Sequence, residues 1–182
     1  MLLGKIIVYL ALFGLGQAML NNFQFNSHSN NYDKKYIVYV FLSESCPICQ
    51  NITKELKDLH KEFAEKEFDF IGIMPNLSIS NVESIKKFKN KYDLPFNLKL
   101  DREHSLTKEL SATITPEVFV IRKSDNKILY SGKIDNSYER VGKRRTVVTE
   151  HYLKDALKSI SNGVTPNPTY TKAVGCFINP SK

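Results

Sequence analysis

Seven consecutive apolar residues, 36–42, lead into a C-x-x-C motif formed by Cys46 and Cys49. Both alternating faces of this run are apolar, which is typical of a central strand covered by helices on each side. After the motif, apolar residues recur at the spacing of one buried helix stripe. They are Ile48, Ile52, Leu56, Leu59 and Phe63. Strand, paired cysteines and helix, in that order, predict a redox site.

Cys46 lies at the predicted first turn of the helix that follows the strand. There, unpaired backbone N–H groups and the positive end of the helix dipole favour a thiolate over a thiol. A free cysteine has a pKa near ~8.5, and helix N-termini and C-x-x-C motifs lower it to roughly 3.5–7.5. Cys46 is therefore the predicted nucleophile, and Cys49, one turn further along the same helix face, is the predicted resolving thiol.

A metal site is the other common use of C-x-x-C, but structural zinc needs four ligands, usually with a second Cys or His pair at short spacing. The chain has one further cysteine, Cys176, and its histidines are scattered: His28, His60, His104 and His151. We therefore expect neither a bound metal nor an organic cofactor. Copper delivery through the two motif cysteines, which are soft ligands, stays open as an alternative, as does an inert pair.

The N-terminal residues 1–18 have the pattern of a secretory signal peptide. A short segment with one lysine precedes the apolar run 6–16, and residues 16–18 (Gly-Gln-Ala) form a small-x-small cleavage site. Export to the periplasm or another extracytoplasmic compartment is expected. An uncleaved membrane anchor is the alternative, although the run is shorter than the ~20 residues that a spanning helix needs. Residues 19–35, rich in Asn and Ser, are predicted to be a flexible lead.

The length of 182 residues and a hydrophobic content of 42% fit one core and one domain. The chain is modestly basic, with 26 Lys and Arg against 19 Asp and Glu. Lysines are interspersed with glutamates along the helix at 48–63, which is typical of a solvated face and does not predict a nucleic-acid partner. The dense basic cluster at 143–145 is interpreted as a surface loop, with an anion or partner site as the alternative.

The rest of the chain predicts further strands and helices. Strands are expected at 68–74, 96–100, 112–121 and 127–130, the last two forming a hairpin. Helices are expected at 82–92, near 106–110 and after Thr149. The resulting domain, 36–163, has an α/β pattern, and the tail 164–182 is expected to be irregular and to lie over the surface.

Two helix starts are assigned from capping residues. Ser80 and Glu83 have the spacing of a capping box, which places Val82 on the inward face of the helix that follows. Thr149 is expected to be the N-cap of the last helix.

This order of elements, with a Thr115-Pro116 pair opening a later strand, resembles the thioredoxin fold over residues 36–163. The strand and helix between Tyr92 and Thr115 resemble the insertion of the redoxin branch. That branch includes the exported thiol-disulfide oxidoreductases and relatives of alkyl hydroperoxide reductase. Segments 132–136, 142–145 and 173–176 look like a subgroup of exported redoxin-domain proteins. The resemblance implies a three-layer fold with a mixed central sheet flanked by helices.

The resemblance also implies roles for site residues. Cys46 would attack, Cys49 would resolve, and Pro116 would be a cis-proline that faces the disulfide. A cis bond would expose the Thr115 backbone to an extended substrate chain beside Cys46, whereas an ordinary trans proline at a strand start is the alternative. Cys176 would be the partner of Cys46 if the tail folds over the site; a buried small side chain and a metal ligand are the other interpretations.

Two features differ from the resembled families. Plain thioredoxins have a buried Asp in the strand before the motif, but residues 36–42 lack an acid, and the nearest carboxylate, Glu44, is expected to point to solvent. Peroxiredoxins place Pro and Thr seven and three residues before the reactive cysteine. Here those positions are Tyr39 and Ser43, so only the Thr role has a substitute.

Together these features predict an exported thiol-disulfide oxidoreductase that exchanges disulfides through Cys46-Pro-Ile-Cys49. Its expected partners are protein thiol or disulfide substrates and a redox partner protein, with a membrane involved only if the N-terminal segment is uncleaved. A thiol peroxidase that uses Cys46, and a copper-binding module, are the alternatives.

Overall fold

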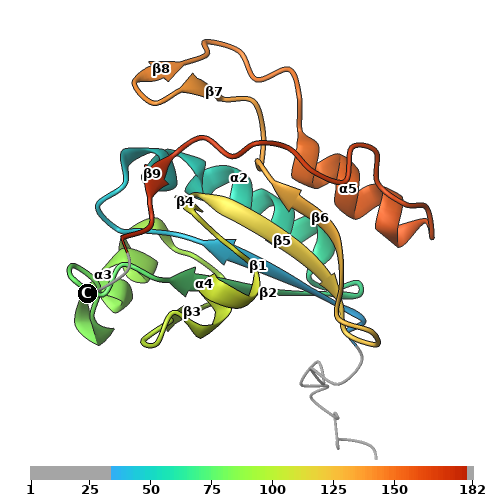
Figure 1. Ribbon diagram of the computed structural model, residues 1–182. Coiled ribbons are helices and arrows are strands. Elements are labelled where there is room, and N and C mark those ends of the chain that lie inside the picture. The colour runs from blue at the N-terminus through green and yellow to red at the C-terminus, as the bar shows by residue number, and fades with distance from the viewer. Residues whose placement is uncertain (1–33, 180–182) are drawn as a thin grey trace, which may run out of the picture. The chain divides into compact units, whose positions relative to one another are not determined.

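The computed structural model describes residues 34–179 (Figure 1). The predicted signal peptide, and all but the last two residues of the predicted lead, lie outside the described residues. Within 34–179, no helix combines the length and apolar character needed to cross a bilayer. The elements in chain order are β1 (Tyr36–Phe41), α2 (Pro47–Phe63), β2 (Phe68–Met74), α3 (Val82–Tyr92), β3 (Asn97–Leu100), α4 (Ser105–Glu109), β4 (Ile114–Thr115), β5 (Glu117–Arg122), β6 (Lys127–Gly132), β7 (Tyr138–Arg140), β8 (Lys143–Arg144), α5 (Tyr152–Ser161) and β9 (Cys176–Phe177).

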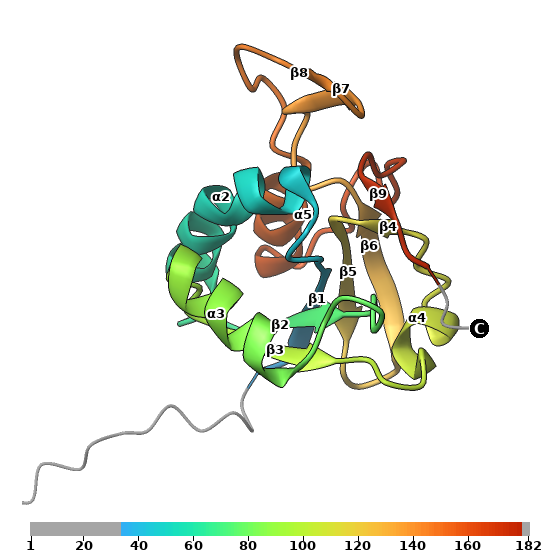
Figure 2. The same ribbon diagram turned by 90° about the vertical axis from the view of Figure 1, so that its left-hand side faces the viewer.

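The central sheet has the strand order β3-β2-β1-β5-β6. Strands β1, β2 and β3 run parallel, whereas β5 is antiparallel to both of its neighbours, β1 and β6. Figure 2 shows α2, α3 and α5 on one side of this sheet and α4 on the other. The predicted mixed α/β sheet flanked by helices is therefore confirmed.

Strand β1 lies at the centre of the sheet and is covered on both faces, as its apolar sequence predicted. Val38 and Val40 pack in the cluster that includes α2 and α5, while Phe41 packs with the segment around Leu110 on the opposite face. Alternating side chains of one strand thus enter both cores. This burial fixes the strand that leads into the cysteine motif.

Helix α2 buries the predicted stripe against that sheet. The buried residues are Ile48, Cys49, Ile52, Thr53, Leu56, Leu59 and Phe63. Their recurrence at three- and four-residue steps turns one helix face toward β1, and this packing positions the first turn of α2 at the end of the strand.

The capping prediction for α3 was wrong by one residue. Asn81 is the N-cap, and its side-chain oxygen accepts hydrogen bonds from the N–H groups of Glu83 and Ser84 at 3.0 and 2.9 Å. Ser84 completes the reciprocal bond by accepting from the Asn81 N–H at 2.9 Å. The shift places Val82 at the first helical position, where it is 63% exposed and not turned inward as expected.

Thr149 does not cap the last helix. The N-cap of α5 is His151, without a side-chain cap bond. Thr149 is instead tied to Asn136, whose amide nitrogen donates to the Thr149 hydroxyl at 2.8 Å and whose amide oxygen accepts from the Thr149 N–H at 3.0 Å. Thr149 therefore secures the loop between β6 and α5.

The tail after α5 returns along the sheet edge. Thr171 donates its N–H to the Ser131 carbonyl at 3.0 Å, and its hydroxyl accepts from the Lys133 N–H at 2.8 Å. Gly132 makes this approach possible, because it has φ +122° and a Cβ there would lie 1.8 Å from the Thr171 carbonyl oxygen. Beyond this anchor the largely irregular tail forms the two-residue strand β9 on β4.

Candidate redox site

Cys46 is the N-cap residue of α2, with extended backbone angles and Pro47 at the first helical position. Its carbonyl accepts the first helical hydrogen bond, from the Gln50 N–H at 3.1 Å, and its own N–H donates to the Ser43 carbonyl at 3.2 Å. The sulfur therefore sits at the positive end of the helix dipole, which favours a thiolate when the cysteine is reduced.

The structure joins Cys46 to Cys176 in a disulfide that spans 130 residues of sequence, with 6.2 Å between the two Cα atoms. Of the partners that the sequence left open for Cys46, the tail cysteine is the one paired here. Strand β9 carries Cys176 alongside β4, with Thr115 opposite Cys176 in an antiparallel register. The tail covers the site, and Cys46 is only 1% exposed.

The Thr115–Pro116 peptide bond is cis, as the resemblance implied. The Thr115 carbonyl oxygen lies 3.3 Å from the Cys46 sulfur, and the Thr115 hydroxyl donates to the Cys176 carbonyl at 3.4 Å. The Thr115 backbone therefore faces Cys46, in the place where an extended substrate was expected. In this structure the protein's own tail occupies that place.

Cys49 is a free thiol and is completely buried. Burial raises its pKa from 9.0 to about 12, although the Ser43 N–H, 3.4 Å from the sulfur, acts in the opposite direction. Desolvation disfavours the charged form because a thiolate in an apolar core loses its water. Cys49 therefore carries a proton at neutral pH.

Glu44 does not point to solvent, contrary to the expectation from the sequence. Its two carboxylate oxygens accept hydrogen bonds from the Ser80 and Ser84 hydroxyls, both at 2.6 Å. Its backbone carbonyl accepts from the Gln50 side-chain amide at 2.8 Å. These bonds fix the loop before Cys46 to the N-terminus of α3. Ser80, which was predicted to cap α3, binds Glu44 instead.

Glu117 is a buried carboxyl group that sequence reasoning missed. Burial raises its pKa, while the Thr113 N–H, which donates to the carboxylate at 3.2 Å, lowers it. Its neighbour Val118 packs in the cluster that contains Cys49, so alternation along β5 turns Glu117 to the other face of the sheet. Glu117 is thus not placed as a proton acceptor for Cys49. The only sequence signal for it was a Glu within an apolar strand, directly after Pro116.

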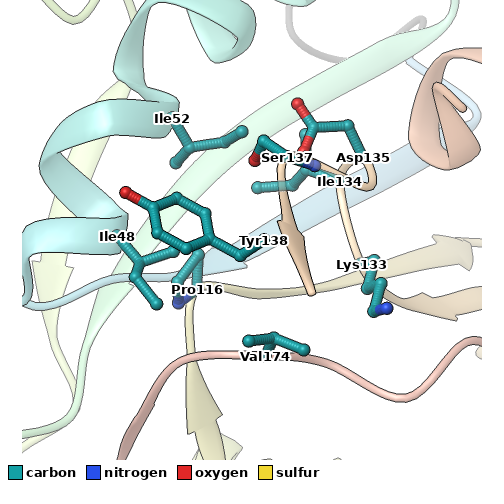
Figure 3. A pocket seen from close by; sticks show the side chains of 9 residues that line it. All are labelled: Ile48, Ile52, Pro116, Lys133, Ile134, Asp135, Ser137, Tyr138 and Val174. Atoms are coloured by element: carbon teal, nitrogen blue, oxygen red, sulfur yellow. Dashed lines mark hydrogen bonds between the residues drawn. The ribbon is translucent and has the colours of Figure 1, made fainter. Parts of the chain in front are cut away.

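A pocket opens beside Pro116, between the first turns of α2 and the segment after β6 (Figure 3). Its apolar walls come from α2, from Pro116 and from the tail, and its polar side from residues after β6. The lining residues are Ile48, Ile52, Pro116, Lys133, Ile134, Asp135, Ser137, Tyr138 and Val174. No sequence pattern indicated that these distant segments meet next to the cysteines.

The part of the chain from 34 to 179 contains no group of three or more His, Cys, Asp or Glu side chains that could hold a metal ion. Cys46 is bonded to Cys176, and Cys49 is enclosed by the apolar core. The geometry therefore gives the copper alternative no support.

Comparison with known proteins decides the family. The family model described as "AhpC/TSA family" matches residues 17–131, more than half of the chain. The chain belongs to the AhpC/TSA family. A relative of this AhpC/TSA protein is Peroxiredoxin Bcp of Bacillus subtilis (strain 168), which is 29% identical over 139 residues, or 73% of this chain and 82% of that protein.

Solved structures agree with this assignment at the level of the fold. A conserved protein of Geobacillus kaustophilus superposes with a TM-score of 0.70 and 25% identity, covering 82% of this chain and 80% of its own. The hypothetical protein SMc02350 of Sinorhizobium meliloti 1021 gives a TM-score of 0.72 and 22% identity, covering 83% and 82%. This AhpC/TSA protein is a thioredoxin-like redoxin and an oxidoreductase with thiol-disulfide redox function, which confirms the resemblance seen in the sequence.

Proposed function

We propose that the protein is an exported thiol-disulfide oxidoreductase in which Cys46 is the nucleophile and Cys176 the resolving thiol. The observation that carries this proposal is the disulfide between Cys46 at the N-terminus of α2 and Cys176 on a strand paired with Thr115. A cysteine at a helix N-terminus is favoured as the thiolate, and the bond to Cys176 supports that residue as the thiol that reaches it.

In the reducing direction, the Cys46 thiolate attacks one sulfur of a substrate disulfide, and the other substrate sulfur leaves as a thiolate that takes a proton from water. The Cys176 thiolate then attacks the Cys46 sulfur, which breaks the mixed disulfide and forms the bond seen in the structure. Two electrons pass from the cysteine pair to the substrate, and an external dithiol restores the pair. The reverse sequence oxidises a dithiol, and the reduction potential sets the direction.

Cys49 was the resolving thiol expected from the C-x-x-C spacing, and its environment argues for a slower role. The attacking species in disulfide exchange is the thiolate. With burial holding its pKa at about 12, Cys49 supplies very little thiolate at pH 7. Cys176 lies in the tail, is only partly buried, and is already in bonding position.

Redox titration with mass mapping of the disulfides tests the assignment. The wild-type protein is expected to interconvert between the dithiol form and the Cys46–Cys176 disulfide form. Cys49→Ser is expected to show the same redox titration as the wild type. Cys176→Ser is expected to lose turnover with a disulfide substrate. A titrating bond between Cys46 and Cys49 in the wild type would instead restore the role predicted from the motif.

A thiol peroxidase is the second candidate, and the similarity to Peroxiredoxin Bcp favours it. In that reaction the Cys46 thiolate attacks a hydroperoxide oxygen, an alcohol leaves, and Cys176 condenses with the sulfenic acid to give the same disulfide and water. Tyr39 and Ser43 occupy the positions where peroxiredoxins place Pro and Thr. Stopped-flow oxidation of the reduced protein by hydroperoxide, no faster than that of a free thiol, would exclude this candidate.

Export is proposed from residues 1–18, whose sequence has the signal-peptide pattern. The expected partners are then protein thiols or disulfides outside the cytoplasm, and a redox partner protein in the same compartment. N-terminal sequencing of the protein recovered from the producing cell tests this: a mature chain that begins after residue 18 supports export, and an intact residue 1 in the cytoplasmic fraction contradicts it.

A further inference from the structure

We propose that tail segment 174–176 occupies the place of a protein substrate, and that the substrate is an extended polypeptide with a glycine directly before its reacting cysteine and an apolar residue before that glycine. The inference deepens the proposed function and rests on it. Three contacts of the tail carry it: backbone pairing on β4, the close approach of Gly175 to Thr115, and the position of Val174 in the pocket beside Pro116.

The backbone pairing is the first step. Strand β4 has two residues and pairs with β9, with Ile114 opposite Phe177 and Thr115 opposite Cys176. The Ile178 N–H extends this pairing by donating to the Thr113 carbonyl at 2.9 Å. Backbone hydrogen bonds of this kind are independent of side-chain identity, so another extended chain can make them on the same edge. The tail and such a chain compete for β4, and the tail takes this edge again as the Cys176 thiolate displaces the substrate.

Gly175 sets the first sequence requirement. A Cβ atom at this position would lie 2.1 Å from the Thr115 carbonyl oxygen and 2.6 Å from the carbonyl carbon. Both atoms belong to the backbone next to Pro116 and cannot rotate away as the end of a flexible side chain can. A chain that places its cysteine on Cys46 in this register therefore has room only for glycine at the preceding position.

Val174 sets the second requirement. It lines the pocket together with Ile48 and Ile52 of α2, with Pro116 facing the same space (Figure 3). Burying a branched aliphatic side chain there is favourable, and a smaller side chain leaves part of that space unfilled. Position 177 carries no such constraint, because Phe177 is 75% exposed.

The two parts of the tail differ in how they are attached, which makes displacement of the cysteine end feasible. Thr171 is hydrogen-bonded to Ser131 of β6 through its backbone and to Tyr130 of β6 through its hydroxyl. The end beyond Gly175 is held by the disulfide, the two-residue strand, the bond from the Asn179 N–H to the Asn76 side chain at 2.9 Å, and Ile178, which is hydrogen-bonded to Thr113 and packs in the cluster with Leu110. Each hydrogen bond contributes only about 0.5–1.5 kcal/mol net, and an incoming chain replaces those on β4. Reduction of the disulfide removes the covalent attachment, so that an incoming chain competes with the tail for β4 while the tail stays attached upstream.

Peptide exchange on a chain with one reactive cysteine tests the inference. The double variant Cys49→Ser, Cys176→Ser is charged at Cys46 as its mixed disulfide with thionitrobenzoate. A peptide thiolate then attacks the Cys46 sulfur, the bond to thionitrobenzoate breaks, and the released coloured thiolate reports the rate. The parent peptide is Ala-Val-Gly-Cys-Phe-Ile, the sequence of residues 173–178. Each rate is divided by the rate of the same peptide with free Ellman's reagent.

Replacing glycine by alanine in the peptide is expected to lower the normalised rate at least tenfold, and replacing valine by alanine severalfold. Replacing phenylalanine by alanine is the matched control, expected to leave the rate unchanged. The tail of the double variant competes equally with all four peptides, so their ratios are unaffected. Equal rates for the glycine and alanine peptides would overturn the inference and leave the proposed function intact. If every peptide reacted no faster with Cys46 than with free reagent, the proposed function itself would fail.

The intact chain supplies an independent test. Gly175→Ala is expected to keep the tail off β4, so that the Cys46–Cys176 bond forms at least tenfold more slowly on oxidation of the reduced protein. Val164→Ala, in an exposed part of the tail, is the control and is expected to behave as wild type. Circular dichroism verifies that both variants are folded. Bond formation at the wild-type rate in Gly175→Ala would contradict the role of that contact.

Discussion

Cys46 and Cys49 are one helical turn apart and both are buried in the same cluster, yet their partners differ. Cys46 is the N-cap of α2, and its sulfur faces Thr115 and the tail. Cys49 lies on the buried face of α2, where burial raises its pKa to about 12. The first is bonded to a residue 130 positions away and the second is a free thiol.

The difference shows that a C-x-x-C spacing does not by itself make two equivalent thiols. The same helix that presents its N-terminal end to Cys46 turns its apolar face toward the sheet at Cys49. The dipole favours the charged sulfur at the first position, whereas desolvation disfavours it at the second. Three measurements test how far the two sulfurs differ, and a fourth tests the loop that holds Cys46.

The largest expected effect is on activity. Cys46→Ser is expected to reduce the disulfide-exchange rate by at least about 10³-fold, because no other group supplies the attacking thiolate. Cys49→Ser is the matched variant and is expected to change the disulfide-exchange rate less than about threefold. The measurement is the dithiol-driven reduction of a protein disulfide. Equal losses in the two variants would show that both sulfurs take part in turnover.

The next effect is on thiol reactivity. In the reduced, folded protein, Cys49 is expected to react with iodoacetamide roughly a thousandfold more slowly at pH 8 than the same residue in the denatured chain, because a shift of three pKa units lowers the thiolate fraction by that factor. Peptide mass mapping follows each cysteine separately. Rapid alkylation of Cys49 in the folded protein, alongside Cys46, would remove the distinction between them.

The third effect is on stability at alkaline pH. The Cys49 thiol has a folded-state pKa of about 12 against an ordinary value of 9.0, so the unfolded chain loses this proton first as the pH rises. The contribution of the protonated Cys49 thiol to the free energy of unfolding is fully present below pH 9 and is lost as the pH rises toward 12. The free energy of unfolding is expected to fall by about 3 kcal/mol between pH 8 and pH 11 on account of this group.

Denaturant titration of the wild type and of Cys49→Ala across this range isolates the effect, since other groups titrate in both proteins. The difference between the two proteins is expected to shrink as the pH rises. A difference that stays constant from pH 8 to pH 11 would mean that Cys49 is less buried than the structure shows.

The smallest effect concerns the loop that holds Cys46. Glu44→Gln replaces a carboxylate that accepts from two hydroxyls, Ser80 and Ser84, and is expected to lower the free energy of unfolding by about 1 kcal/mol. Glu103→Gln, at an exposed position, is the control. No change in Glu44→Gln under the same denaturant titration would show that these hydroxyl bonds do not stabilise the loop.

Much of the fold could be predicted from local sequence patterns. The apolar run before the motif predicted β1, and the spacing from Ile48 to Phe63 predicted the buried face of α2. Such patterns are reliable because the packing of a single element repeats along it. The errors came where one residue decides the outcome: Asn81, and not Ser80, caps α3, since both side chains are suited to the role and tertiary contact with Glu44 takes Ser80.

The candidate site could be predicted only in part. Cys46 at a helix start followed from a motif a few residues long, and the cis bond before Pro116 was implied by the resemblance to the thioredoxin fold. The pairing of Cys46 with Cys176, and the meeting of Val174 with Ile48, join segments more than 120 residues apart, which local spacing does not encode. The sequence left Cys176 open as a partner, and only the path of the tail over β4 distinguishes it from Cys49.

The attachment of Thr171 to β6 has a kinetic consequence for Cys176. Cys176 is the fifth residue after the anchor, so the freed cysteine can travel at most about 18 Å from it. A short flexible tether of this kind holds the thiol at an effective local concentration of the order of millimolar. Reclosure is therefore a first-order event within one molecule, and its rate does not depend on how dilute the protein is.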